Sequence, residues 1–346
     1  MKYMHNGLEL RPTLEFYHDL IPYLGGIKEY DFYMDAHKCA QAWKRANDIL
    51  EKYFSAFCKP RVPGAAPISY GHLISIGAPF TMPEDTEPNV KPFADSIEDA
   101  VEIMKRAAHT DFGANELGIH YQRVNEYLAE SFPEHSISPL SGWANQGVIT
   151  TAVLMRGQDF FIDIYDEPEL AKELLDRITD SILEFQRWSC SVTGQPEVSG
   201  TGAYIADDFA ALIPPALWPE FVLPYWKRYY ETRSTGTYRF LHCEGTAPEH
   251  LRYLKDIGIT RYQPSVSDKL TISNVKANTD VVFDWLLYAW KVTDMSDEQI
   301  KAWVDETVNG GVSIIRTQIG KFAWSQNKQD RLLAFFKAFD KYAVAE

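Results

Sequence analysis

Short β-rich runs alternate with helical segments along most of the chain, and this alternation constrains the fold more than any other feature of the sequence. The runs lie at residues 66–70, 136–140, 201–206, 238–242, 259–264, 281–285 and 312–318. Between them, apolar residues such as Leu170, Leu174 and Ile178 recur at helical spacing. Strands that alternate with helices form parallel β/α units, and their number here fits a closed barrel. We therefore predict an α/β fold of the TIM (β/α)8 barrel class with an N-terminal helical extension.

The N-terminal part of the chain has a different pattern. It reads as mostly helical, since Ala40, Trp43 and Leu50 recur at helical spacing until nearby prolines end the helix. We expect an N-terminal helical cap region at residues 1–64 and a barrel catalytic domain at residues 65–346. No GxGxxG motif follows a predicted strand and no GxxxxGK[ST] motif exists, which argues against dinucleotide-binding and nucleotide-phosphate-binding folds.

Charge and hydropathy argue against several classes of partner. The net charge of −14 leaves no basic face for a phosphate backbone, so we expect no nucleic-acid partner. No apolar run approaches the roughly 20 residues that span a bilayer, and the first residues lack a signal-peptide pattern. We therefore expect a cytoplasmic protein without a membrane partner. The four cysteines lie far apart without a CxxC pair, which argues against a disulfide framework or a four-cysteine zinc site.

The run at residues 238–242 leads directly into polar side chains. In a strand the side chains alternate between faces, so His242 and Glu244 point to the same side and Cys243 points away from it. A helix start follows at Thr246, which reads as the first residue of a capping box. Parallel β/α enzymes place their chemistry at the carboxyl ends of strands. We therefore predict that His242 and Glu244 share one catalytic site, although a purely structural His–Glu pair would give the same pattern.

A second run, residues 201–206, ends in two adjacent carboxylates. Asp207 and Asp208 at a strand end place at least one carboxylate in the site, as a metal ligand, a base or an acceptor for a substrate hydrogen bond. The alternative is helix capping, which one aspartate can perform while the other serves the site.

Neutral polar and aromatic residues near the strand ends are candidates for substrate contacts. Gly142 and Gly147 flank a loop whose side chains could stack on a ligand or bind it by hydrogen bonds, although an ordinary glycine-rich turn would look the same. The residues expected to contact a substrate are Trp143, Asn145, Gln146, Tyr204, Trp285 and Gln318.

Three segments in succession carry a resemblance to a known family. They are residues 202–208, 212–225 and 241–245. They resemble the uroporphyrinogen decarboxylase superfamily, whose members carry two adjacent aspartates, a proline-containing segment and then a histidine-bearing strand. Residues 138–147 and 157–169 are also similar, so the likeness covers most of residues 65–340. The resemblance implies a TIM barrel and one of two activities: decarboxylation in the haem pathway, or methyl transfer to or from a corrinoid protein.

The decarboxylase branch is the less similar of the two. Its members hold a polycarboxylate porphyrinogen with an arginine-rich N-terminal segment that resembles RxPxWxMRQAGR, and nothing in this chain matches that segment. A substrate with many carboxylates also needs several cations in its cleft, whereas the predicted strand ends carry no cluster of them. The resemblance therefore implies a methyltransferase of the corrinoid-dependent, O-demethylase type.

The resemblance also bears on a metal. In the zinc-dependent methyltransferases of this superfamily the corresponding strand carries His-x-Cys, with a second cysteine on the last strand. This chain has Glu244 two residues after His242, and no cysteine near Gln318. A His and carboxylate set holds a harder, more Lewis-acidic Zn²⁺ than a thiolate set does. The expected ligands are His242, Glu244 and Asp208, with Asp207 as the other candidate, and relatives without a metal leave a metal-free site open.

The resemblance implies a reaction as well. A small methylated substrate, for example a methoxylated aromatic compound, lies in the barrel mouth while zinc or one of the acids at positions 207, 208, 242 and 244 stabilises the departing oxygen or nitrogen. The methyl group passes to a Co(I) corrinoid carried by a partner protein. Three alternatives stay open: transfer from a methyl-corrinoid to tetrahydrofolate or a thiol, a uroporphyrinogen-type decarboxylase, and a binding barrel without turnover.

Overall fold

The strands of the chain form one wall of a barrel. The structure is a computed structural model that describes residues 2–57, 59 and 61–344. Its main sheet has the order β10-β1-β2-β9-β8-β7-β6-β5, in which neighbours from β2 to β5 pair in parallel. The strands are β1 (Lys2–His5), β2 (Leu8–Phe16), β5 (Gly202–Ala206), β6 (Tyr238–His242), β7 (Arg261–Gln263), β8 (Val282–Leu287), β9 (Ile314–Ile319) and β10 (Ala343–Val344), with a separate hairpin of β3 (Phe80–Thr81) and β4 (Asn89–Val90).

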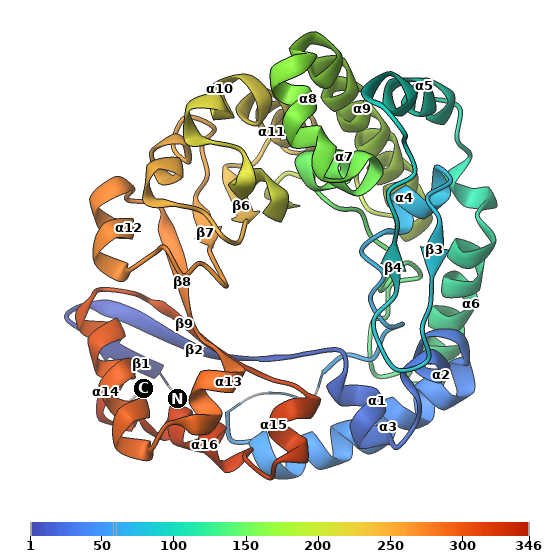
Figure 1. The fold of residues 1–346 in the computed structure, drawn as a ribbon. Coiled ribbons are helices and arrows are strands. Elements are labelled where there is room, and N and C mark those ends of the chain that lie inside the picture. Colours follow the sequence, from blue (N-terminus) through green and yellow to red (C-terminus); the bar gives the residue numbers. More distant parts are fainter. Residues whose placement is uncertain (1, 58, 60, 345–346) are drawn as a thin grey trace.

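Two extended segments complete the ring that Figure 1 shows from one end. Ile68 and Trp143 form a parallel bridge, and the Gly147 N–H donates to the carbonyl of Ala206 in β5 at 2.7 Å. Together with the six parallel strands, these segments occupy the eight positions of a (β/α)8 barrel. The predicted fold class is therefore confirmed.

The structure corrects two strand assignments. β2 lies in the region expected to be helical, and its residues 11–16 pair with β9. Its sequence does alternate, with Leu10 and Leu14 on one face and Glu9 and Glu15 on the other, which is the strand signal. The run at residues 136–140 is irregular chain that ends in a turn and is not a strand; Pro139 within it has no N–H to donate to a ladder. The division at residue 64 stays a prediction.

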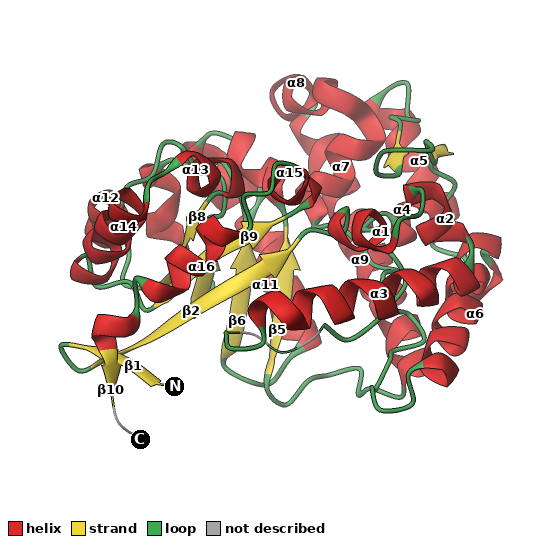
Figure 2. Ribbon diagram, turned by 90° about the horizontal axis from the view of Figure 1, so that it is seen from below, coloured by secondary structure: helices red, strands yellow, loops and turns green. Residues whose placement is uncertain are grey.

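Helices surround the strands, as Figure 2 shows from the side. They are α1 (Leu20–Gly25), α2 (Glu29–Met34), α3 (Ala36–Phe54), α4 (Gly71–Ser75), α5 (Ile97–Ala107), α6 (Glu116–Ser131), α7 (Val148–Arg156), α8 (Phe160–Asp166), α9 (Pro168–Thr193), α10 (Trp218–Phe221), α11 (Leu223–Arg233), α12 (Ile272–Asn278), α13 (Ala289–Asp294), α14 (Asp297–Asn309), α15 (Lys321–Ser325) and α16 (Asp330–Lys337). Within the described ranges, none of them combines the length and apolar character needed to cross a bilayer.

The helix after β6 begins differently from the prediction. It is a 3-10 helix, η5 (Pro248–Tyr253), and Nδ1 of His250 accepts the backbone N–H of Ala247 at 2.9 Å. The hydroxyl of Thr246, predicted to cap this helix, instead contacts the hydroxyl of Tyr262 at 2.5 Å. Thr246 therefore connects the loop after β6 to Tyr262 of β7.

We expect Gly142→Ala to destabilise the barrel. Gly142 has a φ of +80°, and an added Cβ would lie 2.6 Å from the carbonyl oxygen of Ala65 in the neighbouring segment. The strained backbone and the clash should together lower the free energy of unfolding by about 2–4 kcal/mol, which urea unfolding measures. Gly200→Ala is the matched control, because nothing lies within 4 Å of its added Cβ. An equal effect of both changes would contradict the role of Gly142 in barrel closure.

Candidate active site

His242 stands at the carboxyl end of β6, held from one side by an amide. Its Nδ1 lies 2.6 Å from Oε1 of Gln263, and Nε2 of Gln263 donates to Oδ2 of Asp284 at 3.0 Å. A carboxylate only accepts hydrogen bonds, so Asp284 fixes the orientation of the amide, and the amide oxygen in turn needs a proton on Nδ1 of His242. This network leaves Nε2 of His242 free to face the barrel mouth.

Two carboxylates face that free nitrogen. Nε2 of His242 lies 3.4 Å from Oδ1 of Asp208 and 3.6 Å from Oε1 of Glu244. The same Asp208 oxygen accepts the backbone N–H of Glu244 at 2.9 Å, which fixes the strand end of β5 against that of β6. Burial, followed by the negative charge of Asp208, raises the pKa of Glu244. The structure thus brings the three predicted residues together as one acid/base group.

Cys243 points away from this group, as the strand alternation predicted. It is fully buried, and its Sγ donates to the carbonyl of Asp207 at 3.2 Å. Burial, together with the nearby charges of Asp208 and Asp207, raises the pKa of the thiol. Cys243 is therefore a protonated, structural thiol and not a ligand of the site.

Asp207, by contrast, serves the fold. Its carboxylate is fully buried and accepts the backbone N–H groups of Ile149 and Thr150, at 3.1 and 2.7 Å, which begin α7. The indole N–H of Trp226 donates to it at 2.8 Å. Gly147 leaves room for this carboxylate, since an added Cβ there would overlap the Asp207 side chain. The expected catalytic or metal-binding role of Asp207 is corrected to capping of α7, because all three donors engage its oxygens away from His242.

A buried ionic layer, not predicted from the sequence, lies beneath His242. Asp284 receives two hydrogen bonds from Arg261, at 3.0 and 2.9 Å, and lies 3.5 Å from Nη1 of Arg316. Arg316 also forms an ion pair with Glu15 of β2. Each of these charges interrupts a β-rich segment, and that interruption is the signal that could have identified them.

Gln318 and Tyr17 extend the site toward β9 and β2. Tyr17 donates to Oε1 of Gln318 at 3.1 Å, and Nε2 of Gln318 donates to Glu15 at 3.3 Å. Burial, followed by the charges of Glu244 and Glu15, raises the pKa of Tyr17, so its hydroxyl stays protonated beside the carboxylates. The structure therefore places predicted Gln318 at the barrel mouth and adds Tyr17, which the sequence analysis missed.

Tyr204, Asn145 and Gln146 line a cavity of about 150 Å³ together with Ala206 of β5. Tyr204 also lines a cavity of about 580 Å³ that extends from Thr201, at the amino end of β5, to Gln263. In that second cavity its ring stacks on Phe240 with 4.9 Å between centroids. These three predicted residues therefore border hollow space along β5, and the stacked rings give the larger cavity an aromatic wall. Asp208, His242 and Glu244 line neither cavity.

The two tryptophans predicted to contact a substrate lie elsewhere. Trp143 is buried, with its ring 5.5 Å from that of Tyr121, because it packs outward against α6. Trp285 alternates with the inward-facing Asp284, so it points out of the barrel, where it lines a small cavity with Trp303 of α14. Both expectations are corrected: the structure places neither indole in the barrel mouth.

The acid/base group contains the three side chains that the sequence predicts as zinc ligands. The donor types of His242, Asp208 and Glu244 suit zinc. However, no three His, Cys, Asp or Glu side chains in the described part of the chain are arranged to hold a metal ion. The expected zinc and its ligand set stay predictions from the sequence.

A parallel barrel with an acid/base group at the carboxyl ends of β5 and β6 has the architecture of a barrel enzyme. The model of the family "uroporphyrinogen decarboxylase (URO-D)" matches residues 71–281. The chain therefore belongs to the uroporphyrinogen decarboxylase family, as its resemblance implied.

The comparison with solved structures supports the fold. A methyltransferase from Methanosarcina mazei superimposes with a TM-score of 0.63 at 13% sequence identity, over 98% of this chain and 95% of that one. At this identity the likeness concerns the fold. No curated protein matches the sequence.

We expect Glu244→Gln to raise the free energy of unfolding near neutral pH. Folding raises the pKa of Glu244, so the folded state binds its proton more tightly than the unfolded chain does. The ionised carboxylate therefore destabilises the fold above the folded-state pKa, and this cost vanishes below the unfolded value, where both states are protonated. Urea unfolding between about pH 4 and pH 8 measures the difference.

The exposed Glu249 of η5 provides the control for this experiment. Glu249→Gln removes the same charge without relieving repulsion from Asp208. Equal stabilisation by both variants, or a gain for Glu244→Gln that does not shrink as the pH falls, would contradict the placement of Glu244.

Proposed function

We propose that the chain is a methyltransferase that moves a methyl group between a small methylated substrate and the corrinoid cofactor of a partner protein. The observation that carries this proposal is the free Nε2 of His242 facing Asp208 and Glu244 at the barrel mouth. Family membership and the fold of the Methanosarcina mazei methyltransferase support it. The corrinoid partner rests on the sequence resemblance.

The acid/base group supplies a proton to the leaving atom. A methyl ether is a poor methyl donor, because an unassisted alkoxide or phenoxide leaves slowly. Burial and the charge of Asp208 raise the pKa of Glu244, which lies next to Nε2 of His242, and the protonated form of this pair carries a proton within reach of the mouth. As the carbon–oxygen bond of the substrate breaks, this proton goes to the departing oxygen. A corrinoid in its Co(I) state supplies the nucleophile that receives the methyl group.

An aromatic wall lies behind His242, on the side of its Nδ1. The stacked rings of Tyr204 and Phe240 border a cavity of about 580 Å³ that ends at Gln263, the residue that holds Nδ1. A flat ring could stack on this wall, but Nε2 faces away from it, toward the mouth. The proposed substrate class, a methoxylated aromatic compound, therefore rests on the sequence resemblance, and a methyl-corrinoid to tetrahydrofolate or thiol transfer would use the same site in the other direction.

The decarboxylase alternative has less support from the barrel interior. A polycarboxylate substrate needs cations that are free to bind it. Arg261 and Arg316 do lie inside the barrel, but Asp284 and Glu15 pair with them. The cations of the barrel interior are thus already neutralised, while the mouth itself carries the carboxylates of Asp208 and Glu244.

We expect His242→Ala to lower kcat for methyl transfer by about 10²- to 10⁴-fold, the usual contribution of a positioned acid or base. Gln263→Leu should lower kcat by about ten- to a hundredfold and shift the pH profile, because it releases Nδ1 of His242. Methylation of free cob(I)alamin by a panel of methoxylated aromatic compounds, followed by absorbance, measures both effects. Cys243→Ala is the control: it changes the residue next to His242 but should leave kcat within about threefold. Normal activity in His242→Ala would contradict the proposed site.

The zinc prediction is tested independently by elemental mass spectrometry. If acid activation operates, we expect metal well below one equivalent per chain, and turnover that survives a chelator. About one zinc per chain, lost in both His242→Ala and Glu244→Ala, would instead establish the ligand set predicted from the sequence and replace acid activation by Lewis-acid activation.

A further inference from the structure

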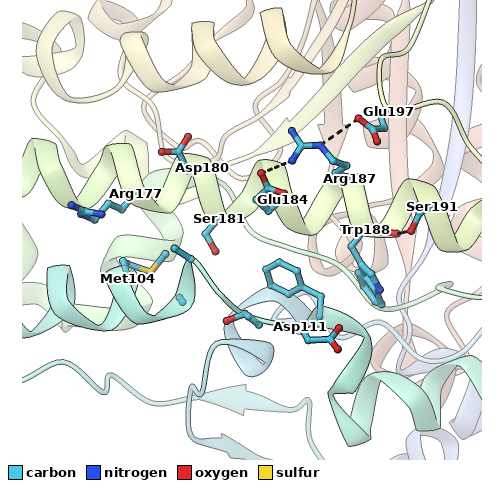
Figure 3. Close-up of a pocket in the computed structure, with 14 residues that line it drawn as sticks. Met104, Asp111, Arg177, Asp180, Ser181, Glu184, Arg187, Trp188, Ser191 and Glu197 are labelled. Atoms are coloured by element: carbon cyan, nitrogen blue, oxygen red, sulfur yellow. Dashed lines mark hydrogen bonds and ion pairs between the residues drawn. The ribbon is translucent and has the colours of Figure 1, made fainter.

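A cavity of about 620 Å³ lies outside the barrel, between α5, the short helix η1 (Phe112–Ala114) and α9. Figure 3 shows it from the side of α9, which forms one wall with residues spaced three or four apart. None of the described lining residues belongs to a barrel strand. The volume falls in the range of small-molecule sites, and the cavity is separate from the site around His242.

The floor of this cavity is apolar and held in place. Met104 and Phe112 are buried there, and the half-buried ring of Trp188 lies 6.2 Å from that of Phe112. Ser181 also reaches the floor, where its hydroxyl contacts Nε2 of the buried His72 at 2.8 Å. The indole of Trp188 thus lies against a fixed hydrophobic surface and remains partly open to the cavity.

The rim carries four carboxylates and two guanidinium groups. Both guanidinium groups are engaged: Arg187 pairs with Glu184 and Glu197, marked as dashed lines in Figure 3, and Arg177 pairs with Glu173 at 2.8 Å. Arg228 pairs with Asp180. Asp111 is different: it accepts the backbone N–H of Gly113 at 3.0 Å, but no cation in the described part of the chain pairs with it.

Asp111 also lies close to the indole of Trp188. An added Cβ on Gly113 would be 3.2 Å from Oδ1 of Asp111 and 3.3 Å from Nε1 of Trp188. A carboxylate without a partner cation and an aromatic ring therefore meet at one end of the cavity.

We propose that this cavity binds an organic ammonium ion that carries an apolar body. The negative rim attracts a cation, the ring of Trp188 offers it a π face, and Asp111 offers it a countercharge. The apolar body lies on Phe112 and Met104. An anion is disfavoured by the charge of Asp111, and a neutral apolar ligand would leave that charge without a counterion.

Isothermal titration calorimetry of the full chain with choline tests this inference. Choline carries a quaternary ammonium group, and its neutral analogue 3,3-dimethyl-1-butanol has the same shape without the charge. We expect saturable binding of choline and at least about tenfold weaker binding of the analogue. Trp188→Leu should weaken choline binding about tenfold and Asp111→Asn several-fold, whereas Trp188→Phe, which keeps a π face, should retain most of it.

Matched controls are available elsewhere on the surface. Trp290→Leu removes an exposed indole from α13, and Glu126→Gln removes an exposed charge from α6; neither should change the affinity. Circular dichroism verifies that each variant is folded. Absence of saturable choline binding, or equal binding of choline and its analogue, would overturn the proposal. Binding that survives Trp188→Leu but is lost in His242→Ala would also overturn it, because the ligand would then lie in the barrel.

Discussion

Asp284 is almost fully buried inside the barrel, where an unpaired carboxylate would be very unfavourable. Arg261 binds both of its oxygens, and Arg316 and Gln263 contact one of them. Because Gln263 must donate to this carboxylate, its amide oxygen is left to accept the proton on Nδ1 of His242. The free nitrogen at the barrel mouth therefore depends on a charge on β8, one layer below it.

Strand alternation gives two adjacent aspartates different roles, one structural and one in the site. Asp207 turns outward and caps α7, while Asp208 turns inward and faces His242. The first fixes the position of α7 and of the β5 end, and the second depends on that position for its distance to Nε2. Removal of either carboxylate therefore affects the site, but only Asp208 can touch a substrate.

Strand alternation also determined how far the sequence could predict the site. Within residues 238–244 it placed His242 and Glu244 together and Cys243 on the other side, because the relative orientation of side chains along one strand follows from their spacing alone. Trp285 was assigned from its aromatic character alone, although the phase of its strand, set by Asp284, turns it outward. The ionic layer joins Glu15, Asp284 and Arg316 from three strands, and no local pattern reveals such pairing. Trp143 was placed in a loop because the strand was predicted to end at residue 140. In the structure Trp143 itself forms the bridge to Ile68, three residues further on.

Helix α9 borders both kinds of hollow in this molecule. Ile182 and Gln186 line the small cavity next to Asn145 and Tyr204, while Ser181 and Glu184, on the adjoining face, line the outer cavity. A ligand in either place that shifts α9 alters the shape of the other. Thermodynamic linkage makes such an influence mutual: whatever free energy one ligand adds to the binding of the second, the second returns to the first. A single helix can thus make the barrel sensitive to molecules that never enter it.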